Sequence, residues 1–210
     1  MMAFWCIVGG GIADALDGKV ARLVKGYSDF GVQYDSLADV ITFGLAPSVL
    51  VYNLIGQPDS GIYIWVSFLP LLFGSLRLAR FNADLVGYDK DSFVGLPIPA
   101  AAYSIISIVP LNSYLIDNAY INGPIWERYE LAFFAVVIYF SILMFSTLSY
   151  PTLSNFTFDG SNKKWLKIIV IVIVLPLLIL YPYLMFFPIM FVFSLAGIKN
   201  WIFKSKESVE

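Results

Sequence analysis

The sequence contains no histidine, a single cysteine and little charge of either sign. Without histidine the protein has neither an imidazole base nor an imidazole metal ligand, so a carboxylate, a lysine, a tyrosine or the substrate itself must accept any proton. Because Cys6 is the only cysteine, no disulfide forms within the chain, and its apolar neighbours indicate a small core residue. The N-terminus also lacks the basic stretch and cleavage site of a secretory signal peptide.

Charged residues make up 13% of the 210 residues, whereas soluble domains carry about 25%. Hydrophobic residues make up 59%, and the mean hydropathy is +0.78. The composition predicts an all-α fold, a polytopic membrane helix bundle, in one domain over residues 1–203, followed by a short polar cytosolic tail at 204–210. We expect membrane lipid around the chain and no nucleic-acid partner.

A membrane-spanning helix needs about 20 mostly apolar residues. Seven stretches meet this requirement, the last two being separated by the sequence Tyr181-Pro182-Tyr183. They cover residues 2–24, 33–54, 61–81, 98–116, 130–149, 165–180 and 183–201.

Basic residues give the orientation of these spans. If the end of the first span near Lys25 faces the cytosol, all of the 13 lysines and arginines except Arg128 lie on the cytosolic side. The same assignment places the stretch 14–39 and the loops 82–96 and 150–164 at that side. We therefore expect an integral protein of the cell (plasma) membrane with its functional site at the cytosolic face.

Four aspartates stand in the stretch 14–39 of an otherwise apolar sequence. Asp14 and Asp17 have the spacing i, i+3, and Asp35 and Asp39 have the spacing i, i+4, so each pair shares one face of a helix. Carboxylates within membrane spans are costly and mark functional sites. Two helices joined by a turn would bring all four together, and a hard divalent cation is the natural occupant of such a cluster.

The neighbours of the aspartates support more than one interpretation. Gly18 and Ala21 expose backbone beside the acids, but small residues also serve close helix packing. Ser28 and Asp29 have the character of helix caps. Arg22 lies near the carboxylates without neutralising them all, and a metal ion together with an arginine suits a phosphate ligand.

At these positions the sequence resembles the signature of the CDP-alcohol phosphotransferases. The match has the form Asp-x2-Asp-Gly-x2-Ala-Arg-x8-Gly-x3-Asp-x3-Asp. The fixed positions are Asp14, Asp17, Gly18, Ala21, Arg22, Gly31, Asp35 and Asp39.

The resemblance implies an integral membrane enzyme that moves a substituted phosphate from a CDP-linked donor to an alcohol and releases CMP. It implies two divalent cations, Mg²⁺ or Mn²⁺, and by analogy with the family a homodimer. Asp39 would be the catalytic general base. The implied metal ligands are Asp14, Asp17, Asp35 and Asp39, and the implied CDP and pyrophosphate contacts are Asp14, Gly18, Ala21, Arg22 and Gly31.

Three further segments resemble the phosphatidylserine synthase branch of that family, and with them the resemblance covers roughly residues 8–155. They are the segment 77–82 (RLARFN), the segment 93–102 (FVGLPIPAAA) and the pattern Ser146-x3-Tyr150-Pro151. Each also has a structural interpretation: a snorkelling basic anchor, a loop-to-helix junction and a helix stop, respectively.

This resemblance implies L-serine as the acceptor and CDP-diacylglycerol or its ether analogue CDP-archaeol as the donor. The serine hydroxyl would attack the β-phosphate, and the serine carboxylate would need a cationic partner. We expect the acceptor to be bound by Arg77, Arg80 and Asn82, with Lys90 a poorer candidate.

Other functions remain compatible with the sequence. An enzyme of the same family could use glycerol-3-phosphate or inositol phosphate as acceptor, because Arg77, Arg80 and Lys90 could bind an additional phosphate. A divalent-cation transporter would also carry acids within the membrane, and a catalytically inactive scaffold would share the fold. Relatives have one more transmembrane helix before the signature, so we expect an eighth, N-terminal span to be missing from this sequence.

Overall fold

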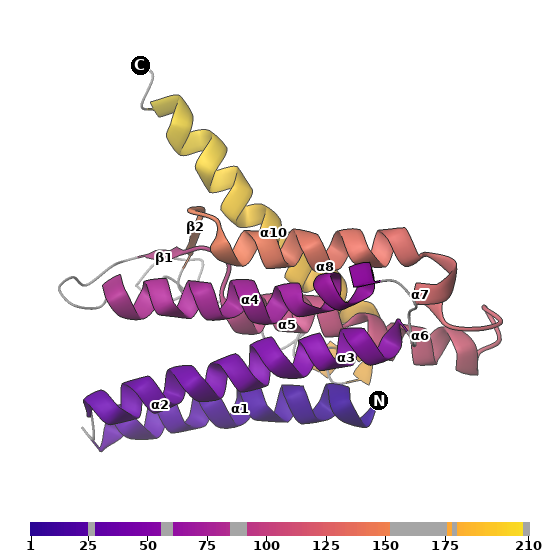
Figure 1. The fold of residues 1–210 in the computed structure, drawn as a ribbon, viewed down its shortest axis with the longest axis horizontal. Coiled ribbons are helices and arrows are strands. Elements are labelled where there is room, and N and C mark those ends of the chain that lie inside the picture. The colour runs from indigo at the N-terminus through magenta and orange to yellow at the C-terminus, as the bar shows by residue number, and fades with distance from the viewer. Residues whose placement is uncertain (25–27, 56–60, 85–91, 152–175, 178–179, 208–210) are drawn as a thin grey trace.

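The computed structural model describes residues 1–24, 28–55, 61–84, 92–151, 176–177 and 180–207. The described part is a bundle of helices with one small sheet (Figure 1). The helical class predicted from composition is therefore confirmed. The predicted span 165–180 lies outside the described residues, apart from Pro176, Leu177 and Leu180.

The first two predicted spans are helical. Helix α1 covers Met2–Leu23. A second helical rod consists of α2 (Asp29–Asp39), a π-helical segment η1 (Val40–Leu45) and α3 (Ala46–Leu54). Pro47 in the first turn of α3 has no backbone N–H to donate, so one hydrogen bond of the regular α-helical pattern is missing where η1 meets α3. This irregular segment begins at the residue after Asp39.

The remaining helices complete the bundle. Helix α4 packs along α8, and α10 packs against α5 and α6. Fully buried residues such as Phe4, Ala101, Val137 and Phe140 form the core between them. The bounds of these helices are Gly61–Asp84 for α4, Ile98–Ile106 for α5, Ile108–Asp117 for α6, Ile125–Arg128 for α7, Glu130–Phe145 for α8 and Pro182–Glu207 for α10.

A two-stranded antiparallel sheet is the element that the all-α prediction missed. Strand β1 (Ser92–Val94) pairs with β2 (Ser149–Pro151), so that Phe93 lies opposite Tyr150. Tyr150 is fully buried and donates a hydrogen bond of 3.3 Å to the carbonyl of Ser194 in α10. The sheet therefore joins the loop before α5 to the chain after α8 and attaches both to α10.

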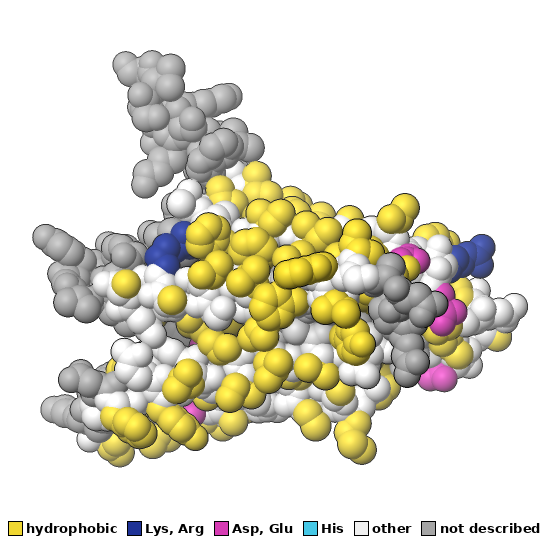
Figure 2. All heavy atoms as spheres, in the orientation of Figure 1, with side chains coloured by type: hydrophobic (Ala, Val, Ile, Leu, Met, Phe, Trp, Pro, Cys, Tyr) yellow, Lys and Arg dark blue, Asp and Glu magenta, His cyan; other side chains and the backbone are white. Residues whose placement is uncertain are grey.

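Three helices in the described residues are long and apolar enough to cross a membrane: Phe30–Leu54, Gly61–Ala83 and Ile98–Asp117. Glu130–Phe145 and Met185–Leu195 are shorter apolar helices. Large apolar side chains such as Trp65, Leu131 and Ile142 are exposed, and Figure 2 shows hydrophobic side chains across one face of the bundle. These three helices agree with three of the seven predicted spans, and the total of seven stays a prediction. Helix α10 extends to Glu207, so the start of the predicted polar tail continues this helix.

Candidate active site

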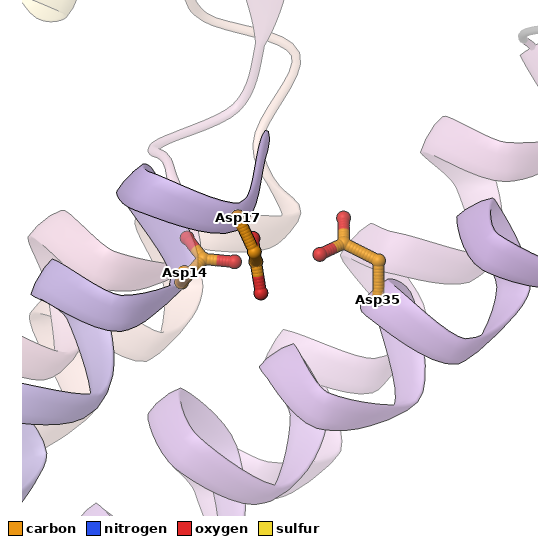
Figure 3. A group of neighbouring side chains, drawn as sticks. All are labelled: Asp14, Asp17 and Asp35. Carbon is orange, nitrogen blue, oxygen red and sulfur yellow. The ribbon is translucent and has the colours of Figure 1, made fainter. Parts of the chain in front are cut away.

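Three of the four aspartates meet between α1 and α2. Single carboxylate oxygens of Asp14, Asp17 and Asp35 all lie within 4.8 Å of one another. Figure 3 shows Asp14 and Asp17 projecting from α1 toward Asp35 on α2. Asp14 is half-buried, and the other two are exposed. The helical spacings in the sequence therefore predicted a real cluster.

A side-chain cap fixes the start of α2. The Oγ atom of Ser28 accepts a hydrogen bond of 3.0 Å from the backbone N–H of Gly31, which confirms the predicted cap at Ser28. A Cβ atom at Gly31 would lie 3.1 Å from this Oγ, so glycine leaves room for the cap. The cap sets the register that points Asp35 toward α1.

Asp39 lies one turn after Asp35, at the end of α2. It interacts electrostatically with Asp14 and Asp35, and its carboxyl group lies within hydrogen-bonding range of that of Asp14. Asp14 thus connects Asp39 to the three-residue cluster. A set of carboxylate oxygens in this arrangement fits a hard cation such as Mg²⁺ or Mn²⁺, which prefers oxygen ligands.

The remaining residues of the signature lie around this cluster. A Cβ atom at Gly18 would meet no heavy atom within 4 Å, so the surface of α1 beside Asp17 is open. Ala21 is half-buried on the same helix. Arg22 belongs to α1, and its side chain lies outside the described part of the structure.

Arg77 is a buried cation of α4. Its side chain is 6% exposed and interacts electrostatically with Asp39 and Arg80. The Nε atom is buried and has no hydrogen-bond partner among the described residues. A buried polar atom of this kind calls for a partner, which a bound ligand could supply.

Arg80 makes a different set of contacts. Its two terminal nitrogens donate hydrogen bonds of 3.0 Å to the carbonyls of Phe145 and Ser146, at the end of α8. The guanidinium also lies 5.3 Å from the centre of the Phe145 ring. Arg80 therefore joins the end of α4 to the end of α8.

Asn82 bonds to α2 rather than to an acidic side chain. Its Nδ2 donates to the Oγ of Ser36 at 3.0 Å, and that hydroxyl lies 3.1 Å from the carbonyl of Val32. Ser36 directly follows Asp35. The Asn82–Ser36 bond therefore fixes the helix that carries Asp35 to the end of α4.

The three segments that resemble the phosphatidylserine synthase branch converge at one end of the bundle (Figure 1). The N–H of Gly95 donates to the carbonyl of Leu148 at 2.8 Å, and that of Leu96 to the carbonyl of Leu143 at 3.0 Å. Gly95 has a φ of +82°, and a Cβ atom there would collide with the carbonyl of Met144 and lie 3.1 Å from Arg80. The segments thus form one structural unit that includes Arg80.

Tyr103 is a residue near the site that the sequence did not reveal. It stands on α5, directly after the alanines of the segment 93–102, and its hydroxyl contacts Gly11 of α1. The phenol also interacts electrostatically with Asp14 and Asp39. The run of alanines indicated close helix packing, but nothing in the sequence showed which helix Tyr103 faces.

Comparisons with known proteins agree with the signature. The sequence model of the family described as CDP-alcohol phosphatidyltransferase matches residues 1–143. The chain is 38% identical over 207 residues to the CDP-diacylglycerol–serine O-phosphatidyltransferase of Helicobacter pylori, covering 97% of this chain and 81% of the relative. It is 37% identical over 145 residues to the protein of the same name from Methanocaldococcus jannaschii, covering 69% and 61%. It is also 41% identical over 141 residues to the archaetidylserine synthase of Methanothermobacter thermautotrophicus, covering 66% and 53%.

Proposed function

Because the chain belongs to the CDP-alcohol phosphatidyltransferase family, we propose that it is a serine O-phosphatidyltransferase. It transfers the phosphatidyl group of CDP-diacylglycerol, or the corresponding group of CDP-archaeol, to the hydroxyl of L-serine and releases CMP. The names of the relatives from H. pylori and M. thermautotrophicus support serine as acceptor and both kinds of lipid donor. The observation that carries the proposal is the acid cluster between α1 and α2, with the buried Arg77 beside Asp39.

The four aspartates are the proposed ligands of two divalent cations, Mg²⁺ or Mn²⁺. When bound, such cations offset the negative charge of the transferring phosphate and of the leaving CMP. Asp14, Asp17 and Asp35 supply converging carboxylate oxygens, and Asp39 adjoins them through Asp14. For the cytidine and pyrophosphate, the proposed contacts are Asp14, Gly18, Ala21, Arg22 and Gly31.

Asp39 is the proposed general base. The serine hydroxyl must lose a proton as it attacks the phosphate, and a base within hydrogen-bonding distance accelerates this step. The sequence contains no histidine, so a carboxylate is the natural acceptor. Asp39 lies at the inner edge of the cluster, half-buried and next to Arg77. A hydroxyl bound between the cluster and Arg77 would meet this carboxylate.

Arg77 is the proposed partner of the serine carboxylate. A guanidinium binds a carboxylate through paired N–H donors, and the Nε of Arg77 is one such donor without a partner in the described residues. Arg80 and Asn82, expected at the acceptor site, are engaged with the carbonyls of α8 and with Ser36, respectively. We therefore propose that these two support the acceptor site by holding its helices in place.

The reaction would take place at the cytosolic face of the plasma membrane, where soluble serine meets a lipid held in the bilayer. The C-terminal half of α1, the start of α2 and the end of α4 lie toward the same end of the bundle (Figure 1). That end carries Arg77 and Arg80, in agreement with the excess of basic residues on the cytosolic side. A homodimer is the proposed assembly, by analogy with the family.

The test is CMP release by the purified chain in detergent, with CDP-diacylglycerol and Mn²⁺ and a panel of acceptors. We expect CMP release to require L-serine, and addition of EDTA to stop it. Glycerol-3-phosphate and inositol phosphate are the competing acceptors, and faster CMP release with either would replace serine in the proposal. Uptake of Mn²⁺ by proteoliposomes without nucleotide, in a protein that releases no CMP, would favour a cation transporter.

A further inference from the structure

The side chain of Tyr103, on α5, packs against α1. Its ring packs edge-on against Phe43, at 5.9 Å between ring centres, and against Phe186, at 6.1 Å. Its hydroxyl contacts Gly11, where a Cβ atom would occupy the same space. Packing against two aromatic rings restricts the orientation of the Tyr103 ring and therefore the position of its hydroxyl. This position depends on the absence of a side chain at residue 11.

That position places the hydroxyl close to the acids. Gly11 and Asp14 have the spacing i, i+3, so the contact at Gly11 lies one turn below Asp14 on the same face of α1. Tyr103 interacts electrostatically with both Asp14 and Asp39. A phenol hydroxyl both donates and accepts hydrogen bonds, and that of Tyr103 has no hydrogen-bond partner among the described residues. The O–H of Tyr103 can therefore donate a hydrogen bond to a carboxylate.

We infer that Tyr103 is a positioning residue of the metal site, whose O–H donates a hydrogen bond to a carboxylate oxygen of Asp14. The inference rests on the metal site of the proposed function. A carboxylate that binds a cation through one oxygen has a second oxygen, and a hydrogen bond to it fixes the orientation of the ligand. Such supporting partners contribute about 10- to 100-fold to metal affinity or activity. Asp14 is also the acid that interacts with all three others, Asp17, Asp35 and Asp39.

The direct test is the affinity of the full-length Tyr103→Phe variant for Mn²⁺, measured by electron paramagnetic resonance without nucleotide or serine. Phenylalanine keeps the ring contacts with Phe43 and Phe186, so we expect the melting temperature of the metal-free protein to stay near that of the wild type. We expect the dissociation constant for Mn²⁺ to rise about 10- to 100-fold. An unchanged Mn²⁺ affinity would overturn the inference.

Tyr139→Phe is the matched control. The Tyr139 hydroxyl shares a hydrogen bond of 3.2 Å with Ser194, in the contact between α8 and α10. This variant loses a hydroxyl of the same kind away from the acids, so we expect its Mn²⁺ affinity to equal that of the wild type. An equal loss of affinity in both variants would show a general effect of losing a tyrosine hydroxyl and would contradict the specific role of Tyr103.

A second variant disturbs the Tyr103 hydroxyl through a substitution on α1. In Gly11→Ala the new methyl group would displace the Tyr103 hydroxyl, so we expect a similar rise in the Mn²⁺ dissociation constant. The double variant Gly11→Ala/Tyr103→Phe should bind Mn²⁺ no more weakly than Gly11→Ala alone, because both changes remove one interaction. Fully additive losses would refute the shared mechanism.

The inference and the proposed function fail in different ways. If the wild type itself binds no Mn²⁺, the metal site of the proposed function fails and the role of Tyr103 fails with it. If the wild type binds Mn²⁺ and releases CMP while Tyr103→Phe binds Mn²⁺ equally well, only the role of Tyr103 is wrong.

Discussion

The guanidinium of Arg77 interacts electrostatically with the carboxylate of Asp39, and its Nε has no hydrogen-bond partner in the described residues. Burying a cation is costly unless its donors are satisfied, so one interaction with Asp39 leaves this arginine incompletely compensated. An incoming carboxylate would complete its hydrogen bonding. The pair therefore joins the proposed base and the proposed acceptor contact in one place, where the hydroxyl of serine could approach Asp39 while its carboxylate binds Arg77.

Arg77→Gln should weaken the binding of serine. A hydrogen bond to a charged group contributes about 1.5–3 kcal/mol, so we expect the KM for serine to rise roughly 10- to 150-fold. The measurement is the initial rate of CMP release at varied serine and saturating CDP-diacylglycerol. Arg128→Gln is the control, because Arg128 is exposed at the end of α7 and its loss should leave this KM unchanged. A fall in kcat with an unchanged KM for serine would show that Arg77 acts through Asp39 instead.

Arg80→Gln should affect stability more than serine binding. The variant loses both hydrogen bonds to the carbonyls of Phe145 and Ser146, and each such bond from a charged donor contributes about 1.5–3 kcal/mol. We expect a clear fall in the melting temperature in detergent and a KM for serine near the wild-type value. The opposite pattern, an unchanged melting temperature with a raised KM, would return Arg80 to the acceptor site.

Asp39→Asn tests the general base. The amide has nearly the same shape but cannot accept the serine proton as a carboxylate does, and a positioned base contributes about 10²- to 10⁴-fold to the rate. We expect kcat to fall by that factor while circular dichroism and the melting temperature show a folded protein. Asp117→Asn, an exposed change at the end of α6, should keep full activity. A near wild-type rate in Asp39→Asn would exclude this residue as the base.

The sequence predicted the acids well because their arrangement depends on local helical spacing. The pairs Asp14 with Asp17 and Asp35 with Asp39 needed only helices, and the cap at Ser28 is a local interaction as well. The small sheet was missed because each strand has three residues and forms only by pairing segments far apart in the chain. The contact of Tyr103 with Gly11 depends in the same way on packing between helices, which the sequence pattern does not record.

The acceptor residues show the same limit. Arg77, Arg80 and Asn82 lie close together in the sequence, which gave no means of separating their roles. On α4 they meet different partners: Asp39, the end of α8 and Ser36, respectively. Only the packing of α4 between the acid-bearing helix and α8 separates these contacts, and on that basis we propose Arg77 for the site and Arg80 for the scaffold.

Asn82→Ala distinguishes a supporting role from direct contact with serine. If Asn82 acts through Ser36, then Ser36→Ala should have the same effect, since both variants remove the hydrogen bond that fixes α2 beside Asp35. We expect each variant to lose about 0.5–1.5 kcal/mol of stability, the usual contribution of one hydrogen bond, with a weaker affinity for Mn²⁺. The double variant should lose less than the sum, because the two side chains contribute one bond. If Asn82 instead contacts serine, Asn82→Ala raises the KM for serine while Ser36→Ala leaves it unchanged, and the supporting role is wrong.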